Sequence, residues 1–401
     1  MKKLINKVMF RSEAGLSVLS SIVAVIGGLL VGLIILLISD YTNAFPAFWL
    51  ILTSGFQSLR NFGEVLSTAT PIILTGLSVG FALKTGLFNI GASGQFSLGA
   101  FVAIYIAIEA TFLPPTLRMI AALICSLLTG AIWGAIPGLL KAFRNVHEVI
   151  SSIMTNWIGI FLVSYLIQNT ILDPTTARTL RIPSGTAIPQ MGLGELFQGS
   201  ATRASTVDIG IIIAIAFAVI AYIILDKTKF GYELKACGFN KDAAKYAGIS
   251  EKSSIVYAMM ISGAFAGLGG ALFYLSGAGV AKSMATVLAP EGFTGISVAL
   301  LGLGNPIGII FSGTLVGFLQ QSGFQVQRFG FVPEIIEIVT SVIIYFCAFV
   351  LIVKMLLNRL NKKGTAQLST DDDSSSSIEL RDETLGEKLT DDSKIDEGSE
   401  E

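Results

Sequence analysis

Long apolar runs recur along this chain, and they restrict its fold more than any other feature of the sequence. The first extends from Leu16 to Ser39, and the last from about Ile335 to Leu357. About 20 mostly apolar residues are enough for a helix to cross a bilayer. Only 14% of the residues are charged, against about 25% in an ordinary soluble domain. The sequence therefore predicts an all-α polytopic membrane protein.

The distribution of Lys and Arg predicts how the chain crosses the membrane. We count about ten passes, with the two segments around Asn305 as separate passes. Seventeen Lys and Arg residues then lie on the side of the N-terminus and seven on the other side, with three more in the C-terminal tail. Because cytoplasmic loops carry an excess of Lys and Arg, we expect both termini to lie in the cytoplasm and the protein to lie in the plasma (inner) membrane.

The domain organisation follows from this topology. We expect a cytoplasmic N-terminus over residues 1–15, a transmembrane domain over 16–360 that contains a cytoplasmic loop at 226–254, and a tail over 361–401. From Gly364 onward the chain holds thirteen acidic and three basic residues. Such a segment cannot bury enough apolar surface to fold alone, so the tail is predicted to be disordered.

The segment from Gly86 to Gln95 interrupts the apolar pattern with three glycines and several amide and hydroxyl side chains. Irregular polar backbone at membrane depth is tolerated where protein covers it or where it lines a water-filled path. Broken helices of this kind form the substrate sites of transporters. We expect the segment to border a translocation pathway; a tight turn that serves only helix packing is the alternative. The side chains expected along the pathway are Phe88, Asn89, Ser93, Gln95, Asn156 and Trp157.

Other small residues and prolines predict how the apolar runs are arranged. Pro71 is expected to break or kink the run from Glu64 to Lys84. Glycines at every fourth position, Gly130, Gly134 and Gly138, predict a close approach to another helix. A second glycine- and amide-rich interruption, ending in Gly304-Asn305-Pro306, lies in the second half. One interruption in each half is compatible with two inverted repeats that contain discontinuous helices.

The sequence offers little that would support catalysis, so no catalytic residue, metal site or cofactor is expected. It contains no G-x-x-x-x-G-K-[ST] phosphate loop, and its three cysteines lack metal-like spacing. The single histidine, His147, is expected to be a surface or capping residue. An ion-driven carrier would usually place ionisable groups deep in its helices. The few acidic candidates within or beside the apolar runs are Glu109, Glu291, Glu334 and Glu337. They are expected near helix ends, which favours an external energy source over an ion gradient.

The loop at 226–254 is the second informative segment. Residues 242–247 are predicted to form a short amphipathic helix with Ala243, Ala244 and Ala247 on a small apolar face and Gly248 as its C-cap. A short helix of small residues suits docking into a groove of a partner protein. An ordinary solvated basic loop is the alternative. The docking residues expected are Gly238, Asn240, Ala243, Ala244, Ala247 and Gly248.

Three segments resemble a known family. They are Gly86-Leu-Phe-Asn-Ile-Gly-Ala-Ser-Gly-Gln95, the loop from Gly238 to Ile249, and Glu291-Gly-Phe-Thr-Gly-Ile-Ser-Val-Ala-Leu-Leu-Gly302. They are similar to the inner permeases of ABC importers for ribose, branched-chain amino acids and nucleosides. The stretch from Val146 to Trp157 and the Arg181-Ile-Pro183 segment look most like the nucleoside (guanosine or uridine) permeases. The likeness covers roughly residues 16–357.

The resemblance implies a permease that hydrolyses no ATP itself. Its expected partners are a second, homologous permease, a cytoplasmic ABC ATPase docked on the Gly238–Ile249 loop, an extracellular substrate-binding lipoprotein and the lipid bilayer; no nucleic acid is expected. The chain departs from the family pattern at His147, where Asn is expected, and at Ser93, where Glu is commoner. The acidic tail also lies outside that pattern.

Several functions therefore remain open on the sequence. The first expectation is a nucleoside permease of an ATP-driven importer. The nearest alternative is an ABC permease for ribose-like sugars or branched-chain amino acids. An ion-coupled secondary carrier, or a membrane scaffold or sensor without substrate flux, belongs to a different class.

Overall fold

The protein is almost entirely helical in a computed structural model, which describes residues 13–176, 178–199, 204–276, 289–356 and 358–359. The expected acidic tail at 361–401 and most of the N-terminal segment at 1–15 lie outside these ranges. Two compact units are present, one of residues 21–350 and one of residues 1–20 with 351–401.

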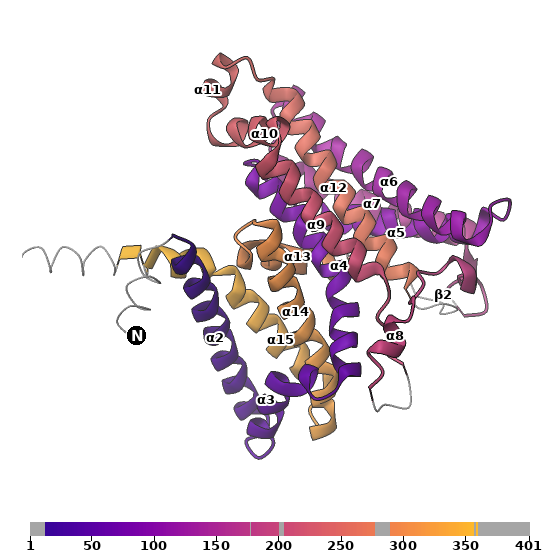
Figure 1. The fold of residues 1–401 in the computed structure, drawn as a ribbon, viewed down its shortest axis with the longest axis vertical. Coiled ribbons are helices and arrows are strands. Elements are labelled where there is room, and N and C mark those ends of the chain that lie inside the picture. Colours follow the sequence, from indigo (N-terminus) through magenta and orange to yellow (C-terminus); the bar gives the residue numbers. More distant parts are fainter. Residues whose placement is uncertain (1–12, 177, 200–203, 277–288, 357, 360–401) are drawn as a thin grey trace, which may run out of the picture. The chain divides into compact units, whose positions relative to one another are not determined.

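The elements are shown in Figure 1, and the predicted all-α fold is confirmed. In chain order they are α2 (Glu13–Ser39), α3 (Ala44–Thr53), η1 (Ser54–Phe56), α4 (Leu59–Lys84), α5 (Ala92–Glu109), α6 (Pro115–Arg144), α7 (Glu148–Thr170), β1 (Leu172–Asp173), β2 (Arg178–Thr179), η2 (Ser184–Thr186), α8 (Leu193–Leu196), α9 (Gly210–Lys227), α10 (Lys229–Phe239), α11 (Lys241–Tyr246), α12 (Glu251–Leu275), α13 (Pro290–Leu301), α14 (Pro306–Val326), η3 (Gln327–Phe329) and α15 (Pro333–Ala348).

The number of membrane passes is close to the expected ten. Eight helices among the described residues are long and apolar enough to cross a bilayer, and Glu334–Phe346 with Val350–Leu356 would make a ninth. Large apolar side chains on the outer faces of these helices are exposed, for example Ile124 on α6 and Ile223 on α9. Exposed apolar faces of this extent mark a surface that lipid or another protein covers.

Helices α4 and α12 form the centre of the helical unit. Within their most apolar stretches 83% and 78% of the residues are buried, against 28% in α6 and 33% in α9. Helix α12 packs against α4, α5 and α6, while α4 also packs against α9, α13 and α14. Of the break or kink expected at Pro71, the break is absent, because α4 continues through this residue; proline has no N–H to donate there.

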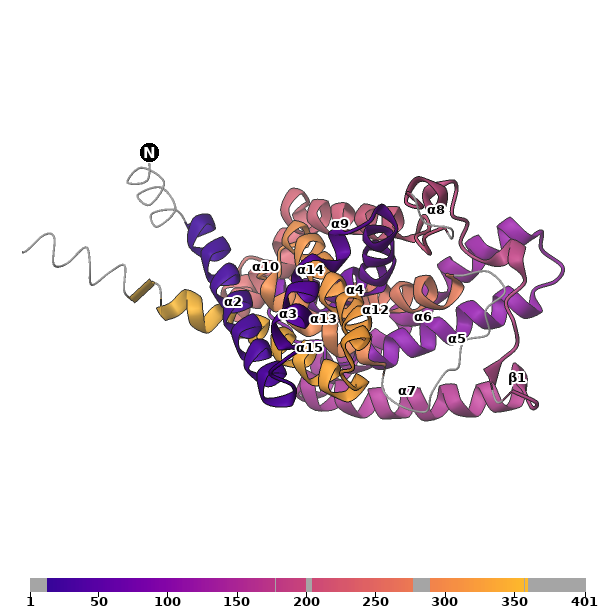
Figure 2. The ribbon, with the colours of Figure 1, turned by 90° about the horizontal axis from the view of Figure 1, so that it is seen from below.

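The close helix approach predicted for the small-residue stripe on α6 is present, and the partner is α12. Gly130 and Gly134 lie directly against the backbone of α12, where Gly263 and Met259 leave no room for a side chain. Close backbone approach through small residues is the usual means by which helices associate in lipid. Figure 2 shows α5, α6 and α7 running side by side.

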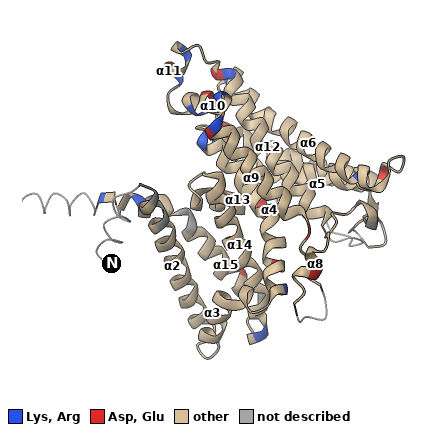
Figure 3. Cartoon of the chain, in the orientation of Figure 1, with Lys and Arg blue, Asp and Glu red and all other residues tan. Residues whose placement is uncertain are grey.

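The charged residues lie mainly at the ends of the helices. Figure 3 shows a concentration of Lys, Arg, Asp and Glu on α10, α11 and the adjacent helix ends, whereas the long helices carry few charges. At the opposite end lie α3, α8 and the small antiparallel pair β1–β2, in which Asp173 faces Arg178. Hydrogen bonds from Thr175 hold the pKa of Asp173 below its ordinary value.

Candidate functional site

The predicted break between α4 and α5 is present, and the sequence explains its geometry. Helix α4 ends at Lys84, and Gly86 adopts a φ of +73°. The amides of Gly86 and Leu87 then donate to the carbonyls of Leu83 (3.2 Å) and Ala82 (2.9 Å). This is the capping arrangement that a glycine after a helix favours. Residues 87–90 form no helix, and α5 starts at Ala92.

Asn89 lies fully buried within this break and joins three helices. Its Nδ2 atom donates to Gln95 Oε1 at 2.8 Å and to Ser262 Oγ of α12 at 2.7 Å. A longer contact of 3.3 Å joins the same nitrogen to the acceptor Ser78 Oγ of α4. Ser262 Oγ in turn donates to the Ser78 carbonyl at 2.7 Å. Buried polar groups are costly unless they are paired, and here Asn89 and Gln95 are paired with each other.

Asn156 of α7 joins both ends of the break. Its Oδ1 atom accepts from the Gly94 amide at 2.8 Å, and its Nδ2 atom donates to the Ile90 carbonyl at 2.8 Å. A free amide at the start of α5 and a carbonyl of the irregular turn are thereby satisfied by one side chain. Trp157 lies elsewhere: it is 44% exposed and stacks against Phe161 on the outer face of α7.

The break also contacts the second half of the chain. Ser93 Oγ donates to the Ala289 carbonyl at 2.8 Å, immediately before α13. Phe88 is half-buried against a small cluster that includes Val79 and Ala299. The structure thus brings five of the six expected pathway side chains together, all except Trp157. In this conformation the polar ones bond to protein groups.

The second interruption lies between α13 and α14, as predicted. Leu303 and Gly304 adopt φ values of +54° and +66°. Asn305 then caps α14, since its Oδ1 atom accepts from the amides of Ile307 (2.9 Å) and Gly308 (3.4 Å). Within the described residues, each half of the chain therefore contains a glycine- and amide-rich interruption of the kind predicted.

The loop expected at 226–254 forms two consecutive helices, α10 and α11. Asn240 caps α11 by accepting from the Ala243 amide at 3.0 Å. Gly248 adopts a φ of +80°, and the amides of Gly248 and Ile249 close the end of the helix on Lys245 and Ala244. The short helix and its glycine cap are confirmed, with the helix at Lys241–Tyr246 instead of 242–247.

The faces of this segment differ in part from the predicted docking surface. Ala243, Ala247 and Gly248 are exposed, but Ala244 is only 3% exposed and points toward the helical unit. The three alanines therefore line one cavity together with unequal exposure, and Ala244 is the one that a partner could not reach.

Two aromatic side chains were missed by the sequence reading: Phe239 and Tyr246 are 88% and 95% exposed. The sequence could have indicated them, because Phe239 lies just before the predicted short helix and Tyr246 lies within it. Aromatic residues at such a docking segment often anchor protein interfaces.

A cavity of about 690 Å³ separates α11 from the ends of α4 and α14. It lies between Ala243, Ala244 and Ala247 on one side and Lys84, Asn305 and Pro306 on the other. Lys235 of α10 lines the same cavity and forms an ion pair with Asp226 at 2.7 Å. The size falls within the range of small-molecule pockets.

His147 caps α7, as expected of a capping residue. Its Nδ1 atom accepts from the Val149 amide at 3.3 Å, and Glu148 beside it forms an ion pair with Lys141. No group of three or more His, Cys, Asp or Glu residues that could hold a metal is found in the described ranges.

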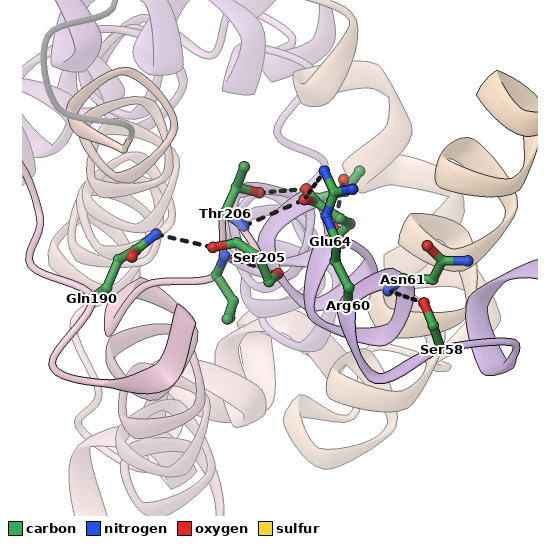
Figure 4. Close-up of polar contacts among 9 residues, drawn as sticks. Ser58, Arg60, Asn61, Glu64, Gln190, Ser205 and Thr206 are labelled. Atoms are coloured by element: carbon green, nitrogen blue, oxygen red, sulfur yellow. Dashed lines mark hydrogen bonds and ion pairs between the residues drawn. The ribbon is translucent and has the colours of Figure 1, made fainter. Parts of the chain in front are cut away.

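At the opposite end, the long loop between α7 and α9 is attached to the start of α4. Figure 4 shows the contacts: Glu64 accepts from Thr206 Oγ1 at 2.5 Å and pairs with Arg60 at 3.7 Å. Gln190 Nε2 donates to the Ser205 carbonyl at 3.0 Å within the loop. Because α4 leads directly to the break, this loop and the break are joined by one central helix.

Comparison with known proteins identifies the family. Residues 61–350 match the family described as the branched-chain amino acid transport system / permease component. The chain belongs to this family. As a permease component of this kind, it is a multi-pass membrane protein and a transport subunit.

Individual members of the family are similar over most of their length. The nucleoside ABC transporter permease protein NupB of Lactococcus lactis is 38% identical, over 85% of this chain and 93% of that protein. The guanosine ABC transporter permease protein NupP of Bacillus subtilis is 37% identical, over 86% and 96%. The glucose ABC transporter permease protein TsgB13 of Haloferax volcanii is 31% identical, over 75% and 79%. No solved structure matches the chain.

Proposed function

We propose that this chain is a transmembrane permease subunit of an ATP-driven ABC importer for nucleosides. The observation that carries the proposal is its similarity to two nucleoside or guanosine permeases, at 37–38% identity over at least 85% of this chain. The break at Gly86–Gln95, which the fold holds beside three other helices, supports a transport role.

The distribution of charge indicates on which side of the membrane each partner of the proposed importer would bind. Under the positive-inside rule the α10–α11 end is cytoplasmic, which would place both termini in the cytoplasm. There a separate ABC ATPase would contact the exposed Ala243, Ala247, Phe239 and Tyr246. A second, homologous permease would complete the translocation unit in the plasma membrane, and an extracellular lipoprotein would deliver substrate to the loop at 171–209.

The pathway in this proposal borders the break. Phe88, Asn89, Ser93, Gln95 and Asn156 are the side chains assigned to it, whereas Trp157, predicted together with them, is exposed on the outer face of α7. Asn89, Ser93, Gln95 and Asn156 bond to protein groups in the described conformation, so they would frame the pathway here and reach a passing substrate only after the helices shift. Specificity would then rest largely with the binding lipoprotein.

Two rival functions have specific support. Similarity to a glucose permease at 31% identity favours a sugar as the alternative substrate, and the family description favours a branched-chain amino acid. An ion-coupled carrier would instead need deep ionisable groups. Among the described spans, Glu109 is the last residue of α5 and Glu334 is the second residue of α15.

Uptake measurements in cells with and without this chain test the proposal. Labelled guanosine, uridine, glucose and leucine are supplied separately, and each is repeated after ATP depletion and after an ionophore that collapses ion gradients. We expect loss of guanosine and uridine uptake on deletion and on ATP depletion, with little effect of the ionophore. Loss of glucose or leucine uptake alone would transfer the assignment to that substrate. Sensitivity to the ionophore alone would identify a secondary carrier.

A further inference from the structure

The C-terminal end of α10 touches the turn that opens the break with no side chain between the two backbones. A Cβ atom built on Gly238 would lie 2.5 Å from the carbonyl carbon of Thr85 and 2.7 Å from the amide nitrogen of Gly86. A Cβ atom built on Gly86 would lie 2.5 Å from the Cα atom of Gly238. Real Cβ atoms essentially never approach other atoms within 3.0 Å. A side chain at either position would therefore separate the two segments.

Helix α10 is well placed to carry a displacement to this contact. Its Leu234 and Cys237 side chains are buried against the helical unit, and Gly231 lies directly on the backbone at the end of α9. Helix α11, in contrast, is separated from the ends of α4 and α14 by the cavity of about 690 Å³. Its ion pair to α12, Lys241–Glu251 at 3.2 Å, is largely exposed, and such pairs contribute little. A force on α11 would thus enter the helical unit through α10, which meets that unit at Gly231, Leu234, Cys237 and Gly238. Of these, Gly238 is the one that lies on the turn at Thr85 and Gly86.

From Gly86 the contacts continue into the centre of the protein. Asn89, three residues later, is bonded to Gln95 and to Ser262 of α12. Ser93 donates a hydrogen bond to the Ala289 carbonyl. Gly292 of α13 lies directly on the Ser93 backbone, since a Cβ atom built on Gly292 would be 2.5 Å from the Cα atom of Ser93. A shift of the turn at Gly86 would therefore reach the start of α13.

We propose that the Gly86–Gly238 contact is the point at which movement of α10–α11 is passed to the broken helix. Glycine at both positions keeps the two backbones together, so that ATP hydrolysis on the partner is coupled to movement of substrate. Gly238 is thereby a positioning residue that faces the helical unit, and docking of the ATPase depends on other residues of the segment. This inference rests on the proposed function above.

The test uses the full chain, co-expressed with its partner subunits and reconstituted in lipid vesicles. Gly238→Ala is expected to lower nucleoside uptake about tenfold, the range over which substitutions at coupling contacts act. ATPase capture and ATP hydrolysis should stay within about twofold of the unaltered complex. Gly330→Ala is the control for an alanine at a positive φ, as in Gly86→Ala below, because Gly330 has a φ of +82° but has no atom within 4 Å of its Cβ position. It should leave both quantities unchanged.

Two further measurements keep the inference open to refutation. Gly86→Ala, from the other side of the contact, should reproduce the uncoupling. In the unaltered complex, addition of a non-hydrolysable ATP analogue should change amide hydrogen exchange at residues 84–91. Unchanged uptake per ATP in both variants, loss of ATPase capture, or unchanged exchange would each overturn the inference. Absence of nucleoside uptake in the unaltered complex would instead refute the proposed function.

Discussion

At the scale of single residues, the polar side chains of the break hold the helices together in this conformation. Asn156 is the clearest case, because its amide satisfies one backbone donor and one backbone acceptor that the irregular turn leaves without helical partners. A carboxylate of the same shape can accept from Gly94 but cannot donate to Ile90. It would place an oxygen against a carbonyl oxygen in a buried site.

Asn156→Asp is therefore expected to destabilise the protein by about 1–3 kcal/mol. Thermal unfolding of the purified chain in detergent would measure the loss. The matched control is Asn169→Asp on the same helix, where the exposed side chain donates to the Tyr165 carbonyl; its effect should remain within about 0.5 kcal/mol. Equal changes in the two variants would contradict the structural role of Asn156.

The residue scale also shows what the sequence could predict. Glycine and amide spacing was enough to place the break at Gly86–Gln95 and the cap at Gly248, since both depend on local backbone geometry. The pairing of Asn89 with Ser262 spans 173 residues and depends on tertiary packing. Asn156 and Trp157 were both predicted to border the pathway, but successive helix residues do not share a face, and Trp157 lies on the exposed side of α7.

At the scale of helices, α6 and α12 approach closely because the glycines at their contact have no side chain. Gly130, Gly134 and Gly263 let the two backbones touch. The sequence predicted the stripe on α6, because small residues at every fourth position form one face. It could not identify α12 as the partner, since several other helices are also rich in Gly and Ala.

Gly134→Ala is expected to destabilise the protein by about 1–3 kcal/mol, the usual cost of overpacking a tight contact. The added methyl group would collide with the Met259 carbonyl oxygen of α12. Ile132→Ala, on the exposed face of the same helix, serves as the control and should change the melting temperature much less. A melting temperature for Gly134→Ala equal to that of the control would show that α12 moves away without cost.

At the scale of the whole molecule, the exposed aromatic side chains of α10–α11 indicate where a large partner would bind. Phe239 and Tyr246 lie on the only part of the described chain that combines two short capped helices with a concentration of charge. Buried aromatic side chains often contribute most of the affinity of an interface.

Phe239→Ala with Tyr246→Ala is expected to weaken capture of the partner ATPase by about tenfold or more. Affinity purification of the tagged permease, followed by quantification of the co-purified ATPase, would measure this. Phe112→Ala with Tyr41→Ala is the control, since these side chains are 84% and 78% exposed outside the α10–α11 segment. An equal loss in the control would point to a general effect of surface aromatics on folding or insertion.

The direct backbone contact between α6 and α12 has a mechanical consequence for the whole protein. Side chains between two helices can change rotamer and absorb small displacements, but two touching backbones have no such compliant layer. The pair should therefore behave as a single stiff beam. Any movement that opens the protein first to one side of the membrane and then to the other would have to occur at other helix contacts, where side chains interleave. Helices α6 and α12 would then move together as one rigid body.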